Sequence, residues 1–119
     1  MAVPPCFCHY LGVTSLTNTS FTAFVRTRRF AVVHFWATWN GYDTKMKDML
    51  ERHVPLDLRN QVAFGRLDID PPEHWDICRQ HNLLNIPFLA FYREGVVVET
   101  LTGMCDREVL IQHLKQMVS

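Results

Sequence analysis

The sequence predicts an α/β fold in which helices cover both faces of a mixed β-sheet. Apolar runs of strand length alternate with segments whose apolar residues recur at helical spacing, an order typical of parallel strands joined by helices. Near the C-terminus, two strand-like segments instead follow each other directly across Glu94-Gly95. That dipeptide is a tight-turn signal, and a tight turn requires an antiparallel pair. The resulting order, βαβαβαββα, is that of a three-layer α/β sandwich.

The first half of the chain begins with an expected irregular arm over residues 1–10, which contains Pro4-Pro5. Residues 17–20 then supply helix-capping side chains ahead of an apolar stripe. Residues 31–36 are apolar nearly throughout, as expected for a central strand covered on both faces. The expected elements are a strand at 11–14, a helix from the 17–20 cap to about 28, a strand at 31–36 and a helix from about 41 that ends or kinks at Pro55.

In the second half, apolar and polar residues alternate over 62–69, which predicts a strand. Pro71-Pro72 favours the first turn of a helix, whose expected buried stripe is Trp75, Cys78 and Asn82. Strands are expected at 88–92 and 96–101, before a last helix capped by Asp106. Its inward-facing residues are expected to be Leu110, Leu114, Met117 and Val118.

Composition narrows the function classes. Hydrophobic residues make up 48% of the 119 residues and charged residues 20%, which indicates one folded globular domain. The net charge of zero argues against a nucleic-acid binder or a membrane-surface protein. No segment approaches the roughly 20 apolar residues of a membrane span, and the N-terminus lacks the pattern of a signal peptide. We therefore expect a cytoplasmic location with mostly reduced cysteines; secretion would instead allow two disulfides.

Five separated motifs occur in a family's order and spacing. They are Phe35-Trp36-Ala37 with Trp39 and Gly41, Asp68-Ile69-Asp70, Asn85-Ile86-Pro87-Phe88, Tyr92-Arg93-Glu94-Gly95, and Gly103. Together they resemble the thioredoxin family over residues 11–118. The resemblance implies a thioredoxin-like fold, a single domain over residues 1–119, and a cis Ile86–Pro87 bond that faces the active site.

The chain departs from the family at the redox site. Asn40 and Asp43 stand where the two redox cysteines are expected, Tyr42 replaces the proline between them, and His34 replaces a buried aspartate. Asn and Asp cannot cycle between dithiol and disulfide. We therefore expect no conventional disulfide reductase activity, no cofactor and no metal.

Asn40 and Asp43 have two interpretations. The first is structural: Asn is among the best N-caps, and an acid three residues later resembles a reciprocal capping box. This interpretation explains both residues without catalysis and is the one we favour. The alternative is a proton-transfer pair, or a small-ligand or metal site, formed by His34 and Asp43.

The cysteines offer a second route to redox chemistry. Cys6 and Cys8 form a Cys-x-Cys pair in the N-terminal arm, at a spacing that is not a standard zinc pattern. Cys78 is expected to be a small core residue. Cys105 follows Gly103 and is the thiol to consider for residual redox activity. An unconventional thiol redox protein is therefore an alternative function.

Aromatic side chains at the strand-to-helix junction indicate a binding surface. Trp36 is expected in the core, whereas Trp39 and Tyr42 are expected to be partly exposed beside Pro87. Tyr42 has an equally good structural interpretation as a filler of the proline's place. The resemblance implies a groove that holds a protein or an extended peptide, lined by Trp39, Gly41, Tyr42, Ile86, Pro87, Gly103 and Met104.

Overall fold

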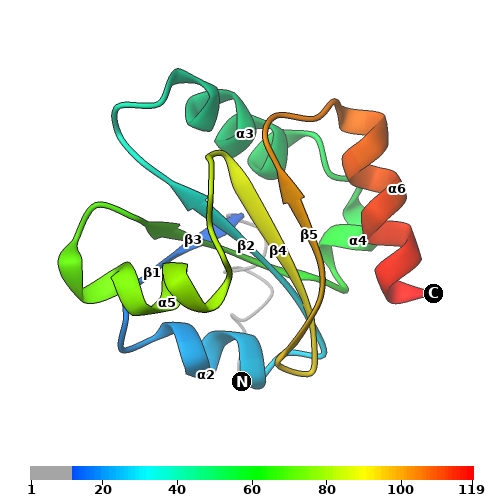
Figure 1. The fold of residues 1–119 in the computed structure, drawn as a ribbon. Helices are drawn as coiled ribbons and strands as arrows, with labels where there is room; N and C mark the ends of the chain where they lie inside the picture. The colour runs from blue at the N-terminus through cyan, green and yellow to red at the C-terminus, as the bar shows by residue number, and fades with distance from the viewer. Residues whose placement is uncertain (1–11) are drawn as a thin grey trace.

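The computed structural model describes residues 12–119 and has a five-stranded sheet between two layers of helices (Figure 1). The expected arm over residues 1–10 lies outside the described residues. The elements are β1 (Val13–Leu16), α2 (Phe21–Arg26), β2 (Phe30–Trp36), α3 (Gly41–Arg52), α4 (Leu56–Arg59), β3 (Ala63–Asp68), the 3₁₀ turn η1 (Pro72–His74), α5 (Trp75–Gln80), β4 (Phe88–Arg93), β5 (Val96–Thr102) and α6 (Arg107–Val118).

The sheet is mixed, as the sequence predicts. Its strand order is β1-β3-β2-β4-β5; β3 runs parallel to both β1 and β2, whereas β4 is antiparallel to β2 and β5. Glu94 and Gly95 both have positive φ angles, 51° and 86°, in the turn that joins β4 to β5. Positive φ at both central residues is the geometry of the tight hairpin turn that the dipeptide indicates.

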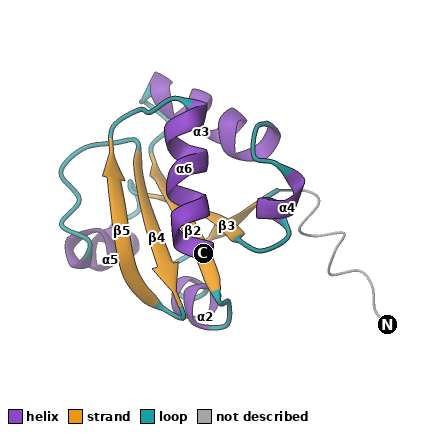
Figure 2. Ribbon diagram, turned by 90° about the vertical axis from the view of Figure 1, so that its right-hand side faces the viewer, coloured by secondary structure: helices purple, strands orange, loops and turns teal. Residues whose placement is uncertain are grey.

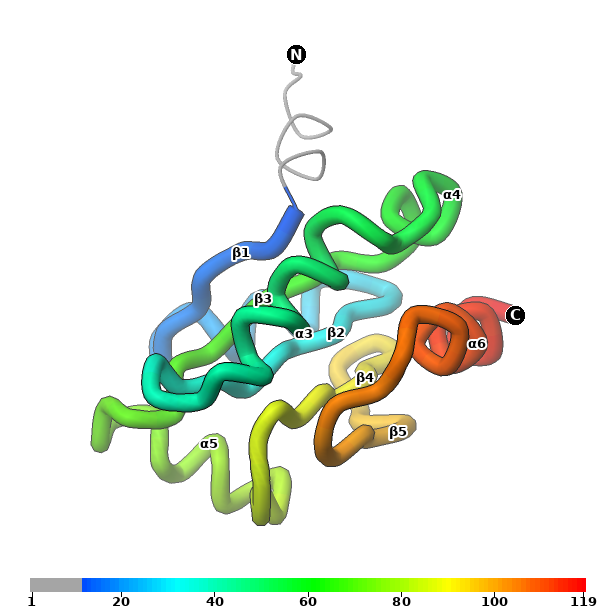
Figure 3. The backbone as a smooth tube through the Cα atoms, turned by 90° about the horizontal axis from the view of Figure 1, so that it is seen from above, coloured from blue at the N-terminus to red at the C-terminus, as the bar shows by residue number. Residues whose placement is uncertain are grey.

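Each face of the sheet has its own hydrophobic core, and Figures 2 and 3 show helices on both sides. Alternate residues of β2 enter opposite cores: Val33 and Phe35 pack toward α2 and α5, whereas Val32 packs toward α3 and α6. Burial on both faces explains why this strand is apolar nearly throughout. The predicted stripe of α6 is also confirmed, because Leu110, Leu114 and Met117 are buried and Val118 packs against the same core.

Three local expectations need correction. Strand β1 starts two residues later than expected, and the short helix α4 follows Pro55, where the sequence predicted only an end or kink. The helix after Pro71 begins as a 3₁₀ turn, and the short α5 that follows faces the core with Ile77 and Cys78. Trp75 is exposed (49%), because it lies about 200° round the helix from Ile77, and Asn82 lies beyond the end of α5 and is exposed as well.

Candidate functional site

The site lies where β2 ends and α3 begins, at the upper edge of the sheet in Figure 1. Asn40 is the N-cap of α3, because its Oδ1 accepts a hydrogen bond of 2.9 Å from the Tyr42 amide. This confirms the capping prediction. Its Nδ2 also donates to the Ile86 carbonyl oxygen at 3.2 Å. One side chain therefore fixes the helix start and ties it to the loop before β4.

Asp43 is not part of a reciprocal capping box, so that part of the prediction is wrong. Its side chain is 3% exposed and lies on the buried stripe of α3 with Met46 and Leu50, facing the sheet. Oδ2 accepts a hydrogen bond of 3.0 Å from the Ala37 amide, and the Asn40 amide bonds to the Ala37 carbonyl instead. The carboxylate thus joins α3 to the end of β2.

The other oxygen of Asp43 pairs with His34, a residue of β2 with no exposed surface. The distance from His34 Nε2 to Asp43 Oδ1 is 2.9 Å. A carboxylate only accepts hydrogen bonds, so Nε2 carries the hydrogen that it donates. His34 Nδ1 is buried without a partner among the described residues. The two residues of the proposed proton-transfer pair are therefore in contact, but no substrate can reach the imidazole.

Around this buried pair, the structure places aromatic and sulfur-containing side chains at the surface. Trp39 is 67% exposed, Tyr42 57% and Met104 37%. We call these three residues the aromatic surface. The Trp39 indole donates a hydrogen bond of 3.1 Å to Asp70 Oδ1, which fixes its orientation. Trp36 is only partly buried and lies under the guanidinium of Arg66, so its expected place in the core is wrong.

The loop before β4 completes the site. The Ile86–Pro87 bond is cis, as expected from the sequence, and the Gly103 amide donates to the Pro87 carbonyl at 2.7 Å. Gly103 has a φ of +89°, a conformation that favours glycine. The Ile86 amide donates to Asn85 Oδ1 at 2.9 Å. Because Asn40 also donates a hydrogen bond to the Ile86 carbonyl, the side-chain amides of Asn40 and Asn85 bind both backbone polar groups of Ile86.

A family model for thioredoxin matches residues 12–116. The chain belongs to the thioredoxin family. It is 31% identical over 110 residues to a bifunctional thioredoxin reductase/thioredoxin of Mycobacterium leprae, which covers 90% of this chain and 23% of that protein. It is 24% identical to a thioredoxin of Mycolicibacterium smegmatis, over 87% of this chain and 92% of the relative. It therefore spans under a quarter of the first protein and nearly all of the second.

Solved thioredoxins have the same fold. The thioredoxin of Malassezia sympodialis superposes with a TM-score of 0.78 at 22% identity, covering 91% of this chain and 95% of its own. A mutant thioredoxin of Halobacterium salinarum also gives 0.78, at 17% identity, covering 100% and 97%. At these identities the likeness shows the fold alone. Over the part described here, none of the helices combines the length and hydropathy needed to cross a membrane.

The described part of the chain contains two cysteines, neither of them at position 40 or 43. Cys78 and Cys105 are free and partly buried, and burial raises the pKa of both thiols. The neighbouring Asp106 carboxylate raises the pKa of Cys105 further. A raised pKa lowers the fraction of the nucleophilic thiolate. Cys6 and Cys8 lie outside the described residues, and residues 12–119 contain no group of three candidate metal ligands.

Sequence reasoning missed a surface hollow of about 270 Å³ beside the buried pair. Its lining comes from the end of β2, the first two turns of α3 and the middle of β3, namely Trp36, Ala37, Thr38, Asp43, Thr44, Lys47 and Arg66. Arg66 gives no local signal, because it is one polar residue in an alternating strand. Its place opposite His34 follows only from the parallel register of β2 and β3.

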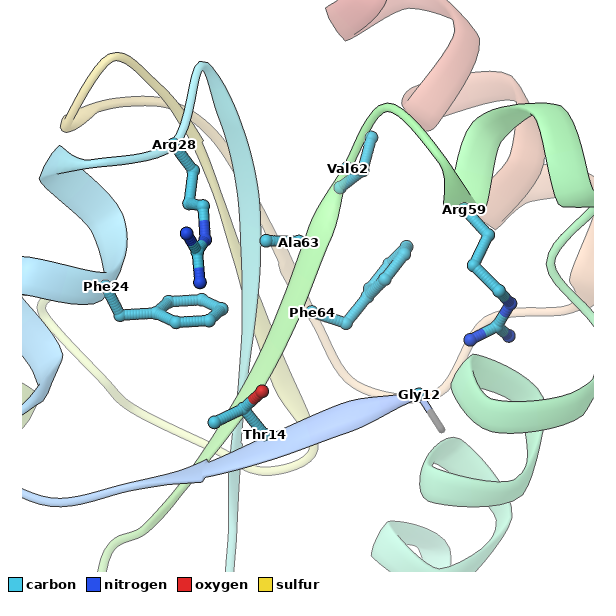
Figure 4. A pocket seen from close by; sticks show the side chains of 8 residues that line it. All are labelled: Gly12, Thr14, Phe24, Arg28, Arg59, Val62, Ala63 and Phe64. Atoms are coloured by element: carbon cyan, nitrogen blue, oxygen red, sulfur yellow. The ribbon is translucent and has the colours of Figure 1, made fainter. Parts of the chain in front are cut away.

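A second hollow, of about 40 Å³, lies at the other end of these strands and is shown in Figure 4. Arg59 lines it and is 8% exposed; its Nη2 donates to the Leu50 and Glu51 carbonyls. These are carbonyls of the last turn of α3, which lack helical partners. Arg59 thus serves as a helix-end cap, and the space has room for little more than water.

Proposed function

We propose that this chain is a thioredoxin-family protein that has lost thiol–disulfide exchange and binds a protein partner through the aromatic surface. The observation that carries the proposal is the pairing of two facts at one place. Asn40 and Asp43, which stand where the resemblance places the two redox cysteines, both make structural hydrogen bonds, while Trp39 and Tyr42 beside them are exposed.

The loss of exchange follows from the chemistry of the site. Exchange needs a thiolate that attacks and a second thiol that resolves the mixed disulfide. Asn40 and Asp43 supply neither, and both side chains are committed to hydrogen bonds that hold α3, β2 and the Ile86 loop together. Several relatives are named as thioredoxins, two, from Arabidopsis thaliana and Oryza sativa, as monothiol glutaredoxins, and one, from Medicago sativa, as a protein disulfide-isomerase. In this chain, the same fold carries a different site.

Binding through the aromatic surface rests on exposure and rigidity. Large aromatic side chains contribute much contact area and have few rotamers to lose on binding. The hydrogen bond from Trp39 to Asp70 holds one of them in place before any partner arrives. Gly41, Ile86, Pro87 and Gly103 would form the floor of the groove between the exposed side chains.

Between the two partner types, a folded protein fits better than an extended peptide. An extended peptide binds by adding backbone hydrogen bonds to free strand-edge groups. The Asn40 and Asn85 side chains already engage the carbonyl and the amide of Ile86. A folded partner that contacts only side chains would leave these hydrogen bonds intact. We further propose that the interaction takes place in the cytoplasm.

The alternative functions have less support. Residual thiol chemistry would depend on Cys105, whose pKa is raised by burial and by Asp106, or on Cys6 and Cys8. Metal or ligand chemistry at His34 and Asp43 would have to act through an imidazole with no exposed surface. Neither alternative has a specific observation in its favour.

The test uses immobilised protein and proteins captured from cells, identified by mass spectrometry. The Trp39→Ala/Tyr42→Ala double variant should lose the specific partners that the unaltered protein retains. Leu84→Ala is the matched control, because Leu84 is 92% exposed and apolar but is not part of the aromatic surface. Equal capture by all three proteins would refute the proposed surface.

A further inference from the structure

The hollow behind the aromatic surface contains a cation without a counter-ion. Arg66 lies on β3 and has no ion pair or hydrogen bond among residues 12–119. Its Nε is buried and unpartnered. Burying a polar group without a partner costs free energy, more so when the group is charged. Because no water-sized molecule can reach Nε, a ligand in the hollow would contact the Nη groups of Arg66, which have no hydrogen bond to any of residues 12–119.

The guanidinium of Arg66 is also held in a fixed orientation. Its central carbon lies 3.9 Å from the centre of the Trp36 ring, well within the range of a cation–π contact. Stacking on the ring leaves the Nη N–H groups, at the outer edge of the guanidinium plane, free to donate. A planar fork of this kind matches the spacing of two oxygens on a phosphate or carboxylate.

The other polar groups of the hollow suit an anion. Lys47 supplies a second positive charge, and Thr38 and Thr44 supply hydroxyl donors. Asp43 opposes them with one negative charge, but its two oxygens already accept hydrogen bonds from His34 and Ala37. Two cations against one carboxylate leave the hollow with a net positive charge.

The size of the hollow limits the ligand. Its volume of about 270 Å³ is just below the roughly 300–1,000 Å³ of sites that hold drug-sized molecules. We infer that this hollow is a binding site for a small phosphate-type oxoanion, either inorganic phosphate or a small phosphomonoester, held by Arg66 and Lys47. The site is separate from the aromatic surface, so it stands or falls independently of partner binding.

The test is a titration of the ¹⁵N-labelled protein with inorganic phosphate at constant ionic strength, followed by NMR. The Arg66 Nε–H signal and the Thr44 and Lys47 amide signals should shift together and saturate. Arg66→Gln and Lys47→Gln should each weaken binding about tenfold or more, the usual loss for one charge-assisted hydrogen bond.

Arg29→Gln is the matched control. Arg29 also stacks on an aromatic ring, 5.1 Å from the centre of Phe30, but lies at the opposite end of β2 from Trp36. This variant removes the same charge and should bind phosphate within about twofold of the unaltered protein. Equal weakening by Arg29→Gln, or shifts that never saturate, would reduce the effect to general charge screening and overturn the inference.

Two further titrations decide the chemical class of the ligand. Acetate at matched ionic strength should bind more weakly than phosphate, because it carries less charge and fewer oxygens. A small phosphomonoester such as glycerol phosphate should saturate the same signals. Whichever of glycerol phosphate and inorganic phosphate binds more tightly identifies the type of ligand that the site takes. If acetate binds as tightly as phosphate, the phosphate assignment is wrong. Because Lys47 is on the helix surface, Lys47→Gln remains informative if Arg66→Gln fails to fold.

Discussion

Two histidines on opposite sides of the sheet differ in how many of their ring nitrogens are hydrogen-bonded. His81 is satisfied on both nitrogens: Nδ1 donates to the Ile77 carbonyl at 2.7 Å, and Nε2 accepts from the Tyr92 hydroxyl at 2.5 Å. His34 has one partner, Asp43, and a buried Nδ1 with none among the described residues.

The difference separates a histidine of the hydrophobic core from one that belongs to the proposed non-redox site. The His81 ring packs against Phe21 and Phe35, with ring centres 5.6 and 4.9 Å away, and the Tyr92 hydrogen bond joins α5 to β4. Packing explains that histidine completely. His34 lies on β2, and its one hydrogen bond holds Asp43, which stands where the resemblance to thioredoxins places the second redox cysteine. Substitutions at and around the two histidines separate these roles.

The largest effect is expected for Asp43→Ala. This change leaves the His34 Nε2–H and the Ala37 amide buried without an acceptor. We expect the free energy of unfolding to fall by about 3 kcal/mol, measured by urea denaturation. Asp106→Ala, which removes the exposed N-cap of α6, is the control and should cost only about 1 kcal/mol. Equal losses in the two variants would show that Asp43 is merely a cap.

Asn40→Ala should have the next largest effect, about 1–2 kcal/mol, because it removes both the cap and the bond to Ile86. Asn40→Ser keeps a capping oxygen and loses the reach to Ile86, so it should fall between alanine and the unaltered protein. This order reverses the expectation from capping alone, in which Asp43 matters less than Asn40. A melting temperature unchanged by Asn40→Ala would contradict the account.

We expect the free energy of unfolding to depend on pH through His81. Burial lowers the pKa of His81 from the usual 6.5, so the unfolded chain binds a proton more readily than the folded one. The stability it contributes is therefore complete above about pH 6.5 and is lost as the pH falls toward the lowered folded pKa. Unfolding free energies between pH 8 and 5 should fall more steeply for the unaltered protein than for His81→Gln. Parallel curves would show that His81 does not titrate with folding.

The smallest effect on stability is expected for Trp39→Phe. The change removes the exposed hydrogen bond to Asp70 but keeps an aromatic side chain, so stability should stay within about 0.5 kcal/mol. Partner capture should nevertheless weaken, because the ring loses its fixed orientation. Thermal melts of the unaltered protein and of Trp39→Phe measure this difference. A large loss of stability would instead show that Trp39 is a structural residue.

Local patterns predicted the order of elements and most of the fold. In β2 and α6, for example, the spacing of the apolar residues alone indicates which side chains are buried. The Asn40 cap was also predictable, since its partner is only two residues away. The role of Asp43 was not, because its partner His34 lies on another element and the capping pattern fits the same residue equally well. Arg66 was missed for a similar reason: its relation to Trp36 and Lys47 exists only after β2, β3 and α3 have packed.

The most direct test of the central claim is the reduction of insulin disulfides by dithiothreitol, with and without this protein. The Mycolicibacterium smegmatis thioredoxin serves as the active comparison. We predict no acceleration above dithiothreitol alone, both for the unaltered protein and for Cys105→Ser, because neither Asn40 nor Asp43 can form the mixed disulfide. Acceleration approaching that of the mycobacterial thioredoxin would contradict the claim that this site has lost thiol–disulfide exchange.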